Sequence, residues 1–108
     1  MSFQKIYKVR DALLKVSSNV GHYEAMDKTD QYIVWAEDSE GDTLETDNTK
    51  EVQTYQGTID YFTKSDGDEN IDKIQEELKK AKISFRLSSV QMEDETRYIH
   101  YEWVWEVA

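Results

Sequence analysis

The chain has 108 residues, of which 23 are acidic and 13 basic, so its net charge is −10, and it contains no cysteine. Disulfides, thiolate metal sites and thiol nucleophiles are therefore excluded. Because lysine and arginine bind phosphate backbones, the acidic balance predicts no specific nucleic-acid binding. The longest apolar run, residues 32–36, is far shorter than the ~20 residues of a membrane-spanning helix, so we expect one soluble domain over residues 1–108 with no membrane partner.

Apolar side chains recur at steps of three and four near the start of the chain, which predicts an N-terminal helix over about residues 3–17. The segment is basic, with Lys5, Lys8, Arg10 and Lys15 against the single acid Asp11. Such a cluster is either a solvated surface or a face that orients association with another molecule.

After residue 21 the apolar spacing changes to a period of two, which predicts extended segments at residues 22–26 and 31–37 and a further strand over 52–64. The pairs Gly41-Asp42 and Asp47-Asn48 are typical of turns and predict an acidic hairpin loop over about residues 37–51. Seven acids stand in this loop against one base: Glu37, Asp38, Glu40, Asp42, Glu45, Asp47 and Glu51.

A second helix is predicted over about residues 69–82, because Ile71, Ile74, Leu78 and Ala81 form an apolar stripe. Acids precede this stripe and lysines end it, as the helix dipole favours. Two strands follow, with a bulge expected near residues 88 and 89, where the apolar parity switches, and a turn at residues 93–96. The predicted fold is α+β, a mainly antiparallel sheet with two helices packed on it, in the order α-β-β-β-α-β-β.

The last predicted strand, YIHYEWVWEV, is the most aromatic part of the chain. The residues between its aromatic side chains include glutamates rather than bases, which argues against a platform for stacking nucleotide bases. One side of the strand is wholly apolar or aromatic and is expected to face the core: Ile99, Tyr101, Trp103, Trp105 and Val107.

No pattern in the sequence indicates catalysis. His22 and His100 are too few for a zinc site unless carboxylates complete it, and the spacings of calcium loops, phosphate loops and nucleophile elbows are absent. We therefore expect no catalytic residue, no cofactor, no metal and no enzymatic activity. Asp60 lies in mid-strand among apolar neighbours, so it is expected either on the solvent side of the sheet or beside a partner.

Four segments together suggest a family: YIVW at 32–35, QGTIDYFTK at 56–64, IDKIQEEL at 71–78, and the ending IHYEWVWEV. In their order and spacing the chain resembles the small tail-completion or tail-terminator proteins of siphoviruses and of prophages in low-GC Gram-positive bacteria. The resemblance runs from about residue 32 to residue 107, with an amphipathic helix in the expected place before it.

The resemblance implies a structural protein of phage assembly. Such a protein would form a ring, commonly a hexamer, on the end of the finished tail tube, stop tube polymerisation and join the tail to the head. Its partners would be copies of itself, the tail tube protein and a head-completion protein. It would act in the cytoplasm of the bacterial host during assembly and then in the virion, at the joint between head and tail.

Two properties of the residues agree with a ring. A carboxylate-lined channel lets DNA pass without binding it, and a basic helix with an acidic hairpin suits a head-to-tail contact that closes on itself. The acids of residues 37–51 would then project toward a neighbouring subunit or the channel. Two alternatives stay open: an acidic mimic of DNA that inhibits a nucleic-acid-binding protein, and a domain that binds a small ligand between sheet and helices.

Overall fold

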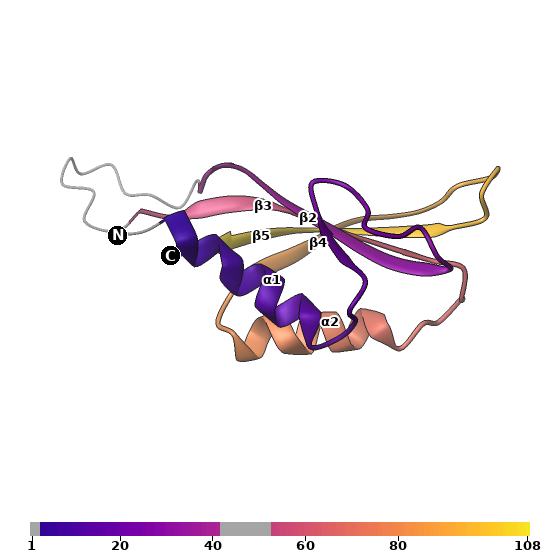
Figure 1. Ribbon diagram of the computed structural model, residues 1–108, viewed down its shortest axis with the longest axis horizontal. Helices are drawn as coiled ribbons and strands as arrows, with labels where there is room; N and C mark the ends of the chain where they lie inside the picture. Colours follow the sequence, from indigo (N-terminus) through magenta and orange to yellow (C-terminus); the bar gives the residue numbers. More distant parts are fainter. Residues whose placement is uncertain (1–2, 42–52) are drawn as a thin grey trace.

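The computed structural model describes residues 3–41 and 53–108, which form one sheet with two helices packed on one of its faces (Figure 1). The predicted α+β fold and its element order are confirmed. In chain order the elements are a 3₁₀ helix η1 (Phe3–Ile6), α1 (Tyr7–Leu14), β1 (Val20–His22), β2 (Gln31–Glu40), β3 (Tyr55–Thr63), α2 (Asn70–Lys80), β4 (Ser84–Met92) and β5 (Ile99–Val107).

The five strands lie side by side in the order β1-β2-β3-β5-β4. β1 pairs with β2 in parallel, and the other three pairs are antiparallel. The last strand along the chain therefore lies between β3 and β4, while β1 and β4 form the edges of the sheet.

The N-terminal helix is shorter than predicted and begins with a turn of 3₁₀ helix. The α-helical part ends at Leu14 rather than near residue 17. Each residue of a 3₁₀ helix rotates further about the axis than in an α-helix, so η1 shifts the phase of the apolar stripe. Ile6, Val9 and Leu13 are fully buried, whereas Phe3 and Leu14, which the predicted stripe included, remain half exposed.

The predicted extended segment at residues 22–26 is wrong, because β1 occupies Val20–His22 instead. Tyr23 has a φ of 72°, which ends the strand. The chain then passes over the face of the sheet opposite the helices before β2 begins (Figure 1). This loop packs so closely on β1 that a Cβ on Gly21 would lie 2.0 Å from the carbonyl oxygen of Glu24, so only glycine fits there.

β2 and β3 are antiparallel, and their register runs from Gln31 opposite Thr63 to Glu40 opposite Tyr55. Asp38 stands at an irregularity between Glu37 and Ser39 where the register shifts. Most of the predicted acidic loop, including Asp42, Glu45, Asp47 and Glu51, lies outside the described residues.

The two faces of the sheet differ in composition. The face toward α1 and α2, which we call the helix face, supplies the sheet's part of the core: Ile33, Trp35, Ile59, Tyr61, Trp103, Trp105 and Val107. The helices add Ile6, Val9, Ala12, Leu13, Ile74 and Leu78. The predicted core side of the last strand is thereby confirmed, with Trp103 and Trp105 fully buried.

Asp68 fixes the start of α2 against the sheet. Its carboxylate accepts hydrogen bonds from Tyr61 Oη and Thr63 Oγ1, both at 2.6 Å, from Gln31 Nε2 at 2.8 Å and from the backbone N–H of Asn70 at 2.8 Å. Burial alone would raise the pKa of Asp68, but these hydrogen bonds outweigh burial and lower it. Burial, helped by the same carboxylate, raises the pKa of Tyr61 to about 12.

The end of α2 is held by two backbone hydrogen bonds, from Ile83 to Leu78 at 3.0 Å and from Lys82 to Lys79 at 3.0 Å. Lys82 has a φ of 60°, the left-handed conformation that reverses the chain after a helix. β4 then pairs with β5, and their register shifts between Leu87 and Ser89. The predicted bulge is therefore confirmed, with Ser88 as the extra residue.

Candidate functional site

The face of the sheet away from the helices, which we call the open face, is mostly polar and carries more carboxylates than basic groups. Its members follow from the strand register, because residues paired across strands point to the same side. They are Tyr32, Val34 and Ala36 of β2, Gln56, Thr58, Asp60 and Phe62 of β3, His100, Glu102, Val104 and Glu106 of β5, and Ser84, Arg86, Ser89 and Gln91 of β4.

A histidine and a carboxylate are paired on the open face. His100 Nε2 lies 2.7 Å from Asp60 Oδ1. The hydrogen bond to Asp60 raises the pKa of His100, although burial acts in the opposite direction. Asp60 thus lies on the solvent side of the sheet and also beside a partner, so both expectations for this residue are confirmed.

Aromatic rings extend this pair across the sheet. The His100 ring stacks on Phe62 with centroids 4.2 Å apart, and Phe62 stacks on Tyr32 at 4.6 Å. Tyr98 meets Phe62 and Tyr32 edge-on, and its hydroxyl donates a 2.6 Å hydrogen bond to the carbonyl of Thr29. The loop over the open face is thus fixed to the turn before β5.

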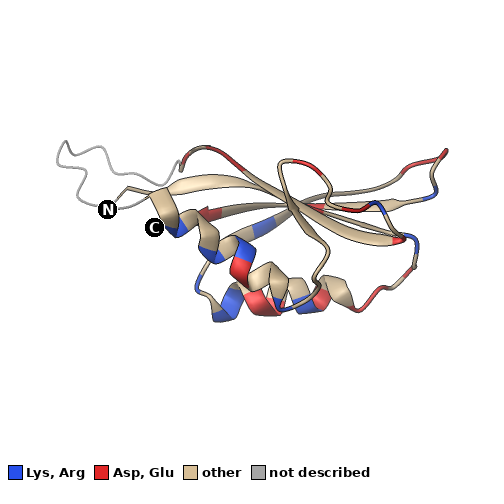
Figure 2. Cartoon of the chain, in the orientation of Figure 1, with Lys and Arg blue, Asp and Glu red and all other residues tan. Residues whose placement is uncertain are grey.

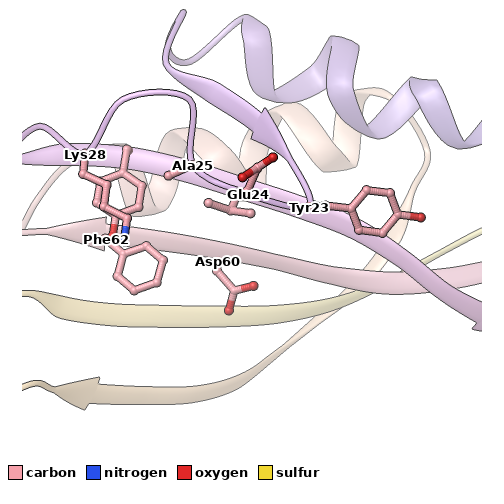
Figure 3. A pocket seen from close by; sticks show the side chains of 8 residues that line it. Tyr23, Glu24, Ala25, Lys28, Asp60 and Phe62 are labelled. Carbon is pink, nitrogen blue, oxygen red and sulfur yellow. The ribbon is translucent and has the colours of Figure 1, made fainter.

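A shallow cavity of about 190 Å³ lies where this loop crosses the open face (Figure 3). Val34 and Asp60 are among the sheet residues that line it, and Tyr23, Ala25 and Lys28 are among those from the loop. Its volume is below the roughly 300 Å³ typical of a small-molecule site. Of its charged lining residues, Asp60 is bonded to His100, and Glu24 and Lys28 come from the loop.

A second histidine–carboxylate pair lies on the helix side of the sheet. His22 Nε2 is 2.7 Å from Glu37 Oε1, and the ring of His22 stacks on Trp35 at 4.0 Å. The hydroxyl of Tyr23 donates to the other oxygen of Glu37. Burial raises the pKa of Glu37, but the hydrogen bonds from Tyr23 and His22 outweigh it and lower the pKa.

The structure describes three of the seven predicted acids. Glu37 is engaged within the subunit, whereas Asp38 and Glu40 lie on the exposed end of β2. Gln53 donates a hydrogen bond to Glu40. The other four, Asp42, Glu45, Asp47 and Glu51, are beyond the described residues.

The four predicted bases all lie on η1, on α1 or at the end of α1, and Figure 2 shows the basic segments of α1 on the side away from the sheet. Lys5 donates to the carbonyl of Gln53 and lies over the ring of Tyr55. Arg10 forms an ion pair with Asp11 at 3.1 Å. Lys8 and Lys15 line a groove between α1 and α2 and are the members of the set most available to a partner.

Both histidine–carboxylate pairs escaped the sequence analysis. The partners are 15 and 40 residues apart, so no local spacing joins them. Strand register was the signal that could have found the pair of Asp60 and His100, because these residues lie on neighbouring strands in adjacent rows.

Within residues 3–41 and 53–108, no group of three or more histidine, aspartate or glutamate side chains is arranged to hold a metal ion. No helix of the described residues is long and apolar enough to cross a membrane. A comparison of the sequence with protein-family models found no match, and a search of curated proteins found no significantly similar sequence.

Proposed function

We propose that the protein is a structural component of phage assembly that caps the tail tube as a hexameric ring, ends tube polymerisation and forms the joint to the head. The observation that carries this proposal is a sheet covered by helices on one face only, whose other face is mostly polar and carries three carboxylates against one arginine. The resemblance of the sequence segments to tail-completion proteins gives the proposal its biological setting.

The open face suits the wall of a channel for DNA. Three carboxylates, Asp60, Glu102 and Glu106, lie on neighbouring strands, against one guanidinium group, that of Arg86. A wall of this composition repels phosphate and has few basic groups to displace the counterions of DNA, so DNA would pass without being held.

The contact between subunits would be head to tail, because opposite charges lie on different parts of the molecule. Lys8 and Lys15 line the groove between α1 and α2, while Asp38 stands near the exposed end of β2, at the start of the acidic loop. A contact between two different patches closes into a ring when the rotation per subunit is right.

The proposal is tested in the phage or prophage that encodes the chain. Deleting the gene should give filled heads and separate tails of uncontrolled length in electron micrographs, and supplying the gene should restore joined particles. Tails of normal length that join to heads without the protein would contradict the proposed function.

Charge reversal tests the subunit contact. Asp38→Lys, Asp42→Lys and Glu45→Lys together should abolish joined particles, because they put like charges opposite the bases of α1. The matched control carries the same three changes at exposed acids elsewhere, Glu24, Asp27 and Asp66. Equal loss in both triple variants would show that net charge rather than the acidic loop is responsible.

The open face supports the alternative function, that of a DNA mimic, less well. A mimic needs free carboxylates in an ordered array, but Asp60 is bonded to His100 and Glu102 accepts a hydrogen bond from Ser88 at 3.0 Å. Arg86 also lies on the same face. Competition between the protein and duplex DNA for a basic DNA-binding protein would separate the two functions.

A further inference from the structure

β4 is an edge strand nine residues long whose outer side has no partner strand among the described residues. Edge strands are usually protected by charged residues or proline, because their free N–H and C=O groups pair readily with another chain. β4 contains no proline and a single charged residue, Arg86.

The helix-face side of β4 is also unusually apolar for an edge. Leu87 is 42% exposed, Val90 49% and Met92 51%, and Phe85 is half-buried in the same row. The bulge at Ser88 keeps all four on one side of the sheet despite the change in sequence parity. The edge therefore offers both backbone hydrogen-bonding groups and an apolar row.

This row is complementary to itself in an antiparallel arrangement. Ser88, the extra residue of the bulge, has no place in the register of β4. When it is left out of the count, a two-fold axis through Ser89 puts Leu87 of one copy opposite Val90 of the other, and Phe85 opposite Met92. Such cross-strand apolar pairs stabilise sheets. On the open face of the same pairing, Arg86 lies opposite the neutral side chain of Gln91, so no like charges meet.

The charges at the two ends of β4 favour the same arrangement. Lysines stand before the strand, at the end of α2, and acids follow it in the turn to β5, at the opposite end of the molecule (Figure 2). Antiparallel pairing places each basic end beside the acidic turn of the other copy. The residues concerned are Lys79, Lys80 and Lys82 at one end and Glu93, Asp94 and Glu95 at the other.

We propose that two copies of the free protein pair antiparallel through β4, with the two-fold axis at Ser89, to form one continuous ten-stranded sheet. This contact uses neither α1 nor the acidic loop, so it goes beyond the ring contact proposed above. It covers the edge until assembly begins and thereby protects the chain from uncontrolled strand pairing.

The mass of the protein in solution is the first test, measured by light scattering after size-exclusion chromatography. The unaltered chain should have about twice its monomer mass of 12.7 kDa. Leu87→Lys combined with Val90→Lys should return the mass to that of one copy, because four lysines would meet at the axis. Ser84→Lys, at the open-face end of the same strand, is the matched control and should remain a dimer.

A monomer at every concentration would overturn the β4 contact, and so would a dimer that persists after the Leu87 and Val90 changes. A hexamer that survives these changes would overturn it too, while supporting the ring. The two proposals can therefore fail separately.

The absence of cysteine allows a second test that does not depend on destabilising variants. Ser89→Cys would place two thiols opposite each other across the axis, within the range of Cα separations that a disulfide spans. Mild oxidation should then crosslink two copies, and much faster than in a Ser84→Cys control. Equal rates of crosslinking in the two variants would contradict the proposed register.

Discussion

The two faces of the sheet are built from alternating residues of the same strands, yet they have different roles. On β5, Trp103 and Trp105 are fully buried against the helices, whereas His100, Glu102 and Val104 on the open face remain partly accessible. Neighbouring positions in sequence thus belong to different environments. The backbone hydrogen bonds between strands serve both faces equally, so the two faces differ only in how deeply their side chains are buried.

The two faces therefore contribute differently to the stability of the fold. Burial of large apolar side chains contributes most of the free energy of folding, so the helix face should dominate the stability of the protein. The open face contributes less and can therefore carry carboxylates and the pair of His100 with Asp60. Substitutions matched across the two faces test this division.

The largest effect is expected from Trp103→Ala, which removes a fully buried indole whose Nε1 donates to Gln75 at 3.0 Å. The free energy of unfolding should fall by about 3–5 kcal/mol, as for other large-to-small core changes. Val104→Ala, one residue further and on the open face, should cost less than about 1 kcal/mol. Urea denaturation followed by tryptophan fluorescence measures both, and similar losses would refute the division.

Asp68→Ala tests the link between sheet and helix layer. Loss of a carboxylate that accepts hydrogen bonds from Tyr61, Thr63 and the start of α2 should lower the free energy of unfolding by about 2–3 kcal/mol. Asp66→Ala, two residues earlier and exposed, should change it by less than about 0.5 kcal/mol.

The effect of Asp68 should depend on pH. Because its folded pKa lies below the ordinary value of 3.8, its contribution is present above pH 3.8 and is lost as the pH falls through the folded pKa. The difference between Asp68→Ala and the unaltered chain should therefore shrink in acid. A difference that stays constant down to low pH would contradict the role of the carboxylate.

Gly57→Ala should destabilise the sheet from its helix face. A Cβ at this position would lie 1.9 Å from the carbonyl oxygen of Ala36 and 2.7 Å from the indole of Trp105, so backbone and core must both shift. The expected loss is about 1–3 kcal/mol, as in other overpacked sites. Thr58→Ala on the open face should cost under about 1 kcal/mol, and thermal unfolding of the two variants compares them directly.

The smallest predicted effect concerns the pair of His100 and Asp60 on the open face. Asp60→Asn should lower the pKa of His100, measured by NMR titration, because the hydrogen bond to the carboxylate is what raises it. The pair stabilises the fold fully below pH 6.5, and this contribution is lost as the pH rises through the raised folded pKa. Under about 1 kcal/mol is expected for so accessible a pair.

Glu102→Gln is the control for that experiment. Glu102 also raises the pKa of His100, but it acts as a charge at a distance rather than through a hydrogen bond to the ring, so its removal should shift the pKa less. A larger shift from Glu102→Gln than from Asp60→Asn would show that the surrounding charges of the open face, rather than the hydrogen bond to Asp60, set the pKa of His100.

Strong periodicity made much of the fold predictable from sequence. The alternation of β5 and the stripe of α2 identified the residues that face the core, because large aromatic and branched side chains define each side. The parity switch between Leu87 and Val90 located the bulge in β4. These features depend on local spacing, which a sequence displays directly.

Features that depend on distant contacts were not predicted. β1 has only three residues, too few for a period of two to appear, and its parallel partner is fixed by the loop that follows. The 3₁₀ start of the first helix left no signal in composition. The histidine pairs of the candidate site arise from strand register, which only the folded sheet establishes.

The central place of β5 has a consequence for how the protein folds as it is synthesised. β2 and β3 can pair early, but β4 has no neighbour until β5 leaves the ribosome and inserts between β4 and β3. Trp103, Trp105 and Val107 complete the core only at that moment. Translation that stops before β5 would therefore yield a chain with an unpaired apolar strand, a ready substrate for chaperones and proteases.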